Sequence, residues 1–220
     1  MKRIIIGALI ALTTFTTQAQ TDEALFLDFK IGTRLAGEES DLTTLGAGLN
    51  IQGGLGYMVT KIWGFKGDLG FNTIKTKSIA NSNVVDRSAL VRSSLQGVLD
   101  VAELANFGIE NFGLNIHSGF GWSTIQNPSW KKAQTSEFTD PGIKGNDDVI
   151  NIIIGLNPQY RINDRLYLDV DYSFNMLAKQ DVTFDTHNNI KINGGMTNYS
   201  TLSFGITYSF IEKVKMSIYF

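Results

Sequence analysis

Apolar and polar residues alternate along most of this chain, and that alternation limits its fold more than any other feature. A repeat of two is the repeat of a β-strand whose faces lie in different surroundings. It occurs in eight segments, most about ten residues long, the length that a tilted strand needs to cross a bilayer. The apolar faces of the eight segments read Leu25, Leu27, Phe29, Ile31; Leu49, Ile51, Leu55, Tyr57, Val59; Trp63, Phe65, Leu69, Phe71; Val91, Leu95, Leu99, Val101; Phe112, Leu114, Ile116, Phe120, Trp122; Ile150, Ile152, Ile154, Leu156; Leu166, Leu168, Val170, Tyr172, Phe174; and Leu202, Phe204, Ile206, Tyr208, Phe210. The sequence therefore predicts an all-β fold of eight strands.

The first residues predict export from the cytoplasm. Lys2 and Arg3 form a positive start, residues 4–12 form an apolar run, and residues 17–19 form a small-residue cleavage site. This order is typical of a secretory signal peptide. The apolar run is shorter than the roughly 20 residues that a membrane-spanning helix needs. We therefore expect a signal peptide over residues 1–19 and a mature chain over residues 20–220.

Composition argues against several kinds of site. The chain has no cysteine, so we expect no disulfide, no thiolate metal site and no lipoprotein anchor. The formal net charge of −2 becomes −4 once Lys2 and Arg3 leave with the signal peptide, which offers no broad basic surface for nucleic acid. No second apolar helix follows. If the chain enters a membrane, it does so with strands that close into a barrel, because each backbone donor and acceptor must be paired in hydrocarbon.

The connections between the eight segments alternate in length. Three are short or turn-like, and the last of them has room for one helical turn: residues 60–62, 163–165 and 102–111. Four are polar and mostly longer: residues 34–48, 76–88, 123–148 and 177–200. Short turns at one end and long loops at the other are typical of outer-membrane barrels, whose long loops lie outside the cell. Residues 211–220 follow the last strand and remain unassigned.

The polar face indicates which side of the sheet faces the membrane. It is small and rich in glycine, as at Gly54, Gly70, Gly119 and Gly205. Solvent-facing strands of soluble proteins rarely carry so many glycines, because glycine weakens a strand. The interior of an eight-stranded barrel has room only for side chains, so small residues fit there. We therefore predict an antiparallel up-and-down transmembrane barrel. A soluble periplasmic ligand-binding barrel, with the apolar face inside, is the alternative.

Two groups of side chains follow from that orientation. A polar network is expected in the lumen, with opposite charges paired because a lone buried charge is costly. Its members are Asp28, Lys30, Lys66, Asp68, Arg92, His117, Asp169 and Asp171. We expect Lys66 or Arg92 to pair with Asp169 or Asp171. An aromatic girdle is expected near the strand ends. Its members are Tyr57, Trp63, Trp122, Tyr160 and Tyr172.

No catalytic residue, metal site or cofactor site is predicted. His117 and Ser118 are neighbours, so they point to opposite faces of a strand and cannot act together. Asp181, Asp185 and His187 resemble the acidic-plus-histidine set of some barrel proteases, but we interpret them as part of a solvated loop. Loop residues Trp130, Lys131 and Lys132 are candidates for contact with lipopolysaccharide phosphates. Pro158 lies within a strand, where we expect a bulge.

Several motifs together resemble the barrel domain of OmpA-family outer-membrane proteins of the Bacteroidota, also described as the OmpX-like or outer membrane protein beta-barrel domain kind. They are residues 63–71 (WGFKGDLGF), 106–107 (NF), 112–114 (FGL), 117–121 (HSGFG), 154–160 (IGLNPQY), 180–185 (QDVTFD) and 204–208 (FGITY). Longer members of that family continue into a peptidoglycan-binding domain, and we expect this chain to be the barrel alone. A terminal aromatic residue is common in proteins handled by the barrel-insertion machinery, and we expect Phe210 or Phe220 to be that residue.

The sequence therefore predicts a non-enzymatic outer-membrane barrel with a structural and surface-display role. Its expected partners are outer-membrane lipid, lipopolysaccharide and the insertion machinery, with no nucleic acid, and its extracellular partner is unknown. A narrow porin-like channel and an adhesin are the alternatives. Against a channel, eight strands leave a lumen that side chains fill, whereas porins need about 16 strands.

Overall fold

A computed structural model describes residues 24–210 apart from residues 36, 41–42, 79–84, 108, 110, 127–145 and 183–190. The predicted signal peptide (residues 1–19), residues 211–220, Asp185 and His187 lie outside this part of the chain. The same holds for the candidate loop residues Trp130, Lys131 and Lys132. These predictions stay predictions.

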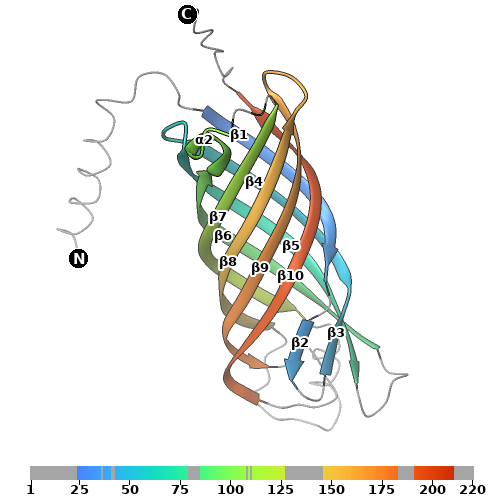
Figure 1. Cartoon of the computed structure of the whole chain (residues 1–220). Coiled ribbons are helices and arrows are strands. Elements are labelled where there is room, and N and C mark those ends of the chain that lie inside the picture. The colour runs from blue at the N-terminus through green and yellow to red at the C-terminus, as the bar shows by residue number, and fades with distance from the viewer. Residues whose placement is uncertain are drawn as a thin grey trace, which may run out of the picture.

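Eight long strands form a closed barrel (Figure 1). They are β1 (Ala24–Arg34), β4 (Gly48–Met58), β5 (Trp63–Ser78), β6 (Val85–Asp100), β7 (Phe112–Gln126), β8 (Asn146–Arg161), β9 (Leu166–Val182) and β10 (Lys191–Ser209). Each pairs antiparallel with its neighbours in chain order, and β1 pairs with β10 to close the wall. Closure pairs the backbone groups that a sheet edge would leave free, which is the condition for crossing hydrocarbon with strands. The predicted eight-stranded antiparallel barrel is confirmed.

The apolar faces of the strands point outward. Leu69, Phe120 and Phe204 are 68%, 65% and 61% exposed, whereas Asn50 and Asn151, on the other face, are completely buried. This is the reverse of a soluble barrel, in which the apolar side chains fill the interior. Among the described residues, no helix is long and apolar enough to cross a membrane.

The two ends of the barrel differ. One end, called here the turn end, carries the connections 59–62, 101–111 and 162–165 together with the start of β1 and the end of β10; it is at the top of Figure 1. The connection 101–111 contains the short helix α2 (Val101–Leu104), confirming the expected helical turn. Asp100 caps this helix by accepting a hydrogen bond from the backbone N–H of Glu103 at 3.0 Å. The opposite end is called the loop end.

At the loop end the strands run further than the sequence analysis predicted. The expected loop 34–48 contains a hairpin, β2 (Gly37–Ser40) and β3 (Thr43–Gly46), and β3 pairs with β5 through Leu45 and Thr76. β5 continues to Ser78 and β6 starts at Val85, inside the expected loop 76–88. The prediction was wrong here because backbone pairing continues where the alternation of apolar and polar side chains has ended. Strand propensity reflects the surroundings of the side chains more than the backbone.

The bulge expected at Pro158 is absent. β8 and β9 pair Leu156 with Tyr172 and Gln159 with Asp169, so the register is the same on both sides of the proline. Proline has no N–H to donate to Val170, the residue opposite it in this register. The side-chain amide of Asn157 donates to the carbonyl oxygen of Val170 at 3.0 Å and takes over that bond. The register shifts instead between β9 and β10, on either side of Gly195.

Candidate functional site

The inward faces of the strands bring charged side chains together in the lumen. All eight residues of the predicted network lie there, and none is more than 5% exposed. Asp28 and Lys30 come from β1, Lys66 and Asp68 from β5, Arg92 from β6, His117 from β7, and Asp169 and Asp171 from β9. The network is therefore a single buried site assembled by five strands.

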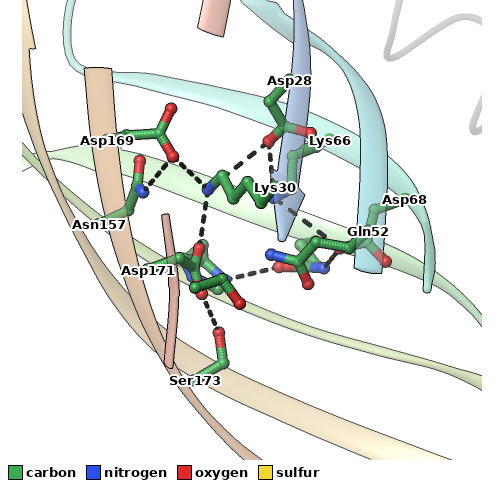
Figure 2. Close-up of polar contacts among 12 residues, drawn as sticks. Asp28, Lys30, Gln52, Lys66, Asp68, Asn157, Asp169, Asp171 and Ser173 are labelled. Carbon is green, nitrogen blue, oxygen red and sulfur yellow. Dashed lines mark hydrogen bonds and ion pairs between the residues drawn. The ribbon is translucent and has the colours of Figure 1, made fainter. Parts of the chain in front are cut away.

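Lys30 is at the centre of this site. Its ammonium nitrogen lies 2.8 Å from Asp171 Oδ2, 3.3 Å from Asp169 Oδ1 and 3.7 Å from Asp28 Oδ2 (Figure 2). Asp28 is shared with Lys66, whose Nζ is 3.2 Å away. Buried charges are tolerated when they are paired and hydrogen-bonded, and this arrangement satisfies both conditions.

Arg92 extends the network towards the loop end. Its guanidinium donates to Asn175 Oδ1 at 2.7 Å and to Gln52 Oε1 at 2.9 Å, and it lies 3.5 Å from Asp68 Oδ2. The ion pairs are therefore not the expected ones. Lys30, not Lys66 or Arg92, forms ion pairs with Asp169 and Asp171. This is possible because only β10 separates β1, which carries Lys30, from β9, which carries the two aspartates.

Glycines on the inner face allow these charged side chains to come into contact. In the register of the sheet, Lys30 lies opposite Gly205, and Gly205 lies opposite Asp169. A Cβ atom on Gly205 would lie 2.5 Å from Lys30 Cγ. At Gly54 a Cβ atom would lie 2.6 Å from Asp28 Oδ1 and 3.2 Å from Lys66 Cδ. The glycine-rich inner face leaves the space through which long charged side chains reach one another.

His117 connects Asp171 with Gln96, and through Gln96 with Asp68. Its Nδ1 is 2.6 Å from Gln96 Oε1, and its Nε2 is 3.2 Å from Asp171 Oδ2. The amide nitrogen of Gln96 donates to Asp68 Oδ2 and to Ser94 Oγ, which turns the amide oxygen towards the histidine. Ser118, by contrast, is exposed on the outer face. The two neighbours do not form a catalytic pair.

A second, apolar layer fills the lumen on the loop-end side of the charges. We call it the apolar plug; each of its side chains is at most 1% exposed. Its members are Ile74, Leu90, Ile125, Val149, Leu177 and Tyr199. Arg34, also completely buried, lies with its guanidinium carbon 5.9 Å from the centre of the Tyr199 ring. This layer was not predicted from the sequence, although it continues the inward repeat of two, from Asn72 to Ile74 and from Arg92 to Leu90.

The five candidate girdle residues all lie on the outer face, between 37% and 56% exposed. Tyr57, Trp63 and Tyr160 are close to the turn end, where β4 ends, β5 begins and β8 ends. Trp122 and Tyr172 lie further along β7 and β9, and the Tyr172 hydroxyl donates to Ser200 Oγ at 3.2 Å. Three of the five thus gather near one rim.

The described part of the chain brings no three His, Asp, Glu or Cys side chains together in a way that could hold a metal ion. The acidic side chains of the lumen are instead interleaved with Lys30 and Lys66, which occupy the positions between the carboxylates. The carboxylates and ammonium groups thus fill this part of the lumen as ion pairs.

Comparison with known proteins gives one family and a set of similar folds. The family described as outer membrane protein beta-barrel domain matches residues 7–210. Neisserial surface protein A has a TM-score of 0.52 at 10% identity, covering 86% of this chain and 99% of that one. OprG from Pseudomonas aeruginosa has a TM-score of 0.50 at 11% identity, covering 88% and 98%. A major outer membrane protein from Thermus thermophilus has a TM-score of 0.50 at 11% identity, covering 86% and 100%. No curated protein sequence matches.

Proposed function

The chain belongs to the outer membrane protein beta-barrel domain family, and from that premise we propose that it is a non-conducting, non-enzymatic barrel that presents its loop end at the cell surface. It is located in the outer membrane, and its outward apolar belt contacts the lipid. The role is structural: the wall anchors the protein, and the loop end meets the exterior.

The filled lumen is the observation that carries this proposal. Conduction of solutes needs an aqueous path, and eight strands leave a space that side chains can fill. Here that space holds a paired charge network and, on its loop-end side, the apolar plug, whose Leu90, Ile125 and Leu177 are completely buried. An ion entering the plug would exchange its hydration shell for mainly apolar side chains, which costs free energy.

The orientation follows from the connections. Short turns of outer-membrane barrels lie on the periplasmic side and the longer connections lie outside. The turn end would then face the periplasm, and the loop end, extended by the β2–β3 hairpin, would face the exterior. Within the longer connections, Trp130, Lys131 and Lys132 are the residues we propose for contact with lipopolysaccharide phosphates, on the strength of their charge and the indole ring.

The contacts and the burial of His117, the one histidine among the described residues, support a non-enzymatic role. Both ring nitrogens of His117 face acceptors, Gln96 Oε1 and Asp171 Oδ2. Its ring is only 4% exposed, so it has no route to a substrate. A general base must come within hydrogen-bond reach of the proton it removes.

Two measurements test the proposal. In planar lipid bilayers we expect no steady conductance from the refolded protein, and a stable open level would favour a narrow channel instead. Because the chain has no cysteine, single cysteines report the orientation. Asn146→Cys, at the loop-end start of β8, should react with a membrane-impermeant maleimide on intact cells. Lys61→Cys, in a turn-end connection, should react only after lysis, and the reverse pattern would overturn the orientation.

A further inference from the structure

The outer wall of the barrel carries an apolar groove near the turn end. It has a volume of about 330 Å³. Its walls come from β7, β8, β9 and β10 and consist of Phe112, Pro158, Tyr160, Leu168, Val170 and Phe204. Gln159, Asp169 and Gly205 complete the lining.

The groove exists because two short outward side chains lie opposite each other. Pro158 is followed on the outer face of β8 by Tyr160, and Val170 lies between Leu168 and Tyr172 on the outer face of β9. The register between β8 and β9 places Pro158 opposite Val170. Large side chains therefore stand around two small ones and leave a depression in an otherwise convex wall.

The walls of the groove select an apolar occupant. No wall residue has a charged side chain. The one carboxylate among the lining residues, that of Asp169, points into the lumen: it lies 3.3 Å from Lys30 Nζ, and its Oδ2 accepts a hydrogen bond from the Thr207 hydroxyl at 2.8 Å. The walls offer no cation to a phosphate, whereas a hydrocarbon chain would contact apolar side chains on several sides at once.

The surroundings identify the source of that hydrocarbon. Tyr160, Leu168 and Phe204 at the rim are 56%, 49% and 61% exposed, and they continue the belt that faces the lipid. We propose that the groove is a lipid-binding site that holds one acyl chain of a glycerophospholipid from the leaflet on the turn-end side. Tyr160 is the last residue but one of β8, which places the groove in that half of the membrane. The choice of a glycerophospholipid, the lipid of the periplasmic leaflet, rests on the proposed orientation, whereas the affinity of the groove for an acyl chain does not.

Photocrosslinking tests the site directly. The protein is refolded into phosphatidylethanolamine vesicles that contain a small fraction of phosphatidylethanolamine with a diazirine on one acyl chain, and crosslinked residues are mapped by mass spectrometry. We expect crosslinks to Leu168, Val170 and Phe204 to exceed several-fold those to Leu69 and Leu95, which are 68% and 54% exposed on the β5–β6 wall. Crosslinks spread over the belt in proportion to exposure would overturn the proposal. Crosslinks obtained with a diazirine fatty acid but not with the phospholipid would refute the phospholipid as ligand.

A filled groove provides the second test. Val170→Trp places an indole in the depression, and Leu95→Trp adds the same side chain to the convex wall as the matched control. We expect the first variant to lose most of the crosslinks at Leu168 and Phe204 and the second to keep them. If Val170→Trp fails to fold, judged by a missing mobility shift between unboiled and boiled samples on a gel, Val170→Leu replaces it, with a smaller loss expected. An unchanged crosslink pattern in the folded variant would show that the groove is not the site.

Discussion

Lys30 and Asp169 lie on strands that are not neighbours, and their side chains meet at 3.3 Å across Gly205, the residue between them in the register of the sheet. The glycine is what allows this contact, because a side chain there would occupy the space through which the lysine reaches. On the inner face of this barrel, glycines such as Gly54 and Gly205 thus leave space for the long charged side chains beside them.

The first prediction concerns that glycine. A Cβ atom at Gly205 would lie 2.5 Å from Lys30 Cγ and closer still to the Phe29 carbonyl oxygen. We expect Gly205→Ala to lower the free energy of unfolding by about 1–3 kcal/mol, the usual cost of overpacking. The measurement is urea unfolding in lipid vesicles, followed by tryptophan fluorescence.

Gly67→Ala is the control for this variant. A Cβ atom at Gly67 would meet no atom nearer than the Ser94 carbonyl oxygen at 4.0 Å, and we expect no loss of stability. Equal losses of stability at the two glycines would mean that the cost at Gly205 does not come from crowding in the lumen.

The second prediction concerns the central cation. Lys30→Met removes the positive charge that lies between Asp169 and Asp171 and leaves both carboxylates buried. Breaking a buried pair in this way costs about 3–5 kcal/mol. We expect Asp171→Asn to recover part of that loss in the double variant, because it removes the uncompensated charge. A double-mutant cycle of unfolding free energies measures the coupling; additive effects would argue against a direct interaction.

The third prediction separates the two layers of the lumen. Arg92→Glu reverses the charge at this position and removes the guanidinium that donates to Asn175 and Gln52. The network must therefore rearrange, and we expect the free energy of unfolding to fall. The apolar plug remains, and we expect no steady conductance in planar bilayers. A conducting Arg92→Glu barrel would show that the charge network, not the plug, closes the path.

Much of this fold could be predicted from the sequence because the membrane imposes a strict rule on the outer face. Leu27, Phe29 and Ile31 alternate with polar residues, and the structure exposes all three. The charged residues of the lumen follow from the same repeat. What could not be predicted is which charges meet, because that depends on register: Lys30 reaches Asp169 only because both are opposite Gly205.

The apolar plug and the ends of the strands were missed for a related reason. Ile74 and Leu90 break the expectation of a polar inner face, and a single sequence offers no sign that the lumen changes character near one end. Beyond the belt, the outer face carries polar residues such as Lys75, so the apolar and polar faces no longer differ clearly. The hydrogen-bonded pairing of β5 with β6 nevertheless continues to Lys77 and Val85.

The last prediction concerns the repair of the ladder at Pro158. The Asn157 amide donates to the Val170 carbonyl oxygen at 3.0 Å, in place of the N–H that proline lacks. Asn157→Leu should leave that carbonyl oxygen unpaired and lower the free energy of unfolding by about 1–3 kcal/mol. In a Pro158→Ala background the backbone N–H can make the bond itself, so the same substitution should cost less. Part of the measured cost comes from Gln159, which donates to Asn157 Oδ1 at 2.9 Å. Asn157→Leu removes that acceptor in both backgrounds. Asn157 also donates to Asp169 Oδ1 at 3.3 Å. A cost that is the same with and without the proline would mean that Asn157 acts through Gln159 or Asp169 and not through the ladder.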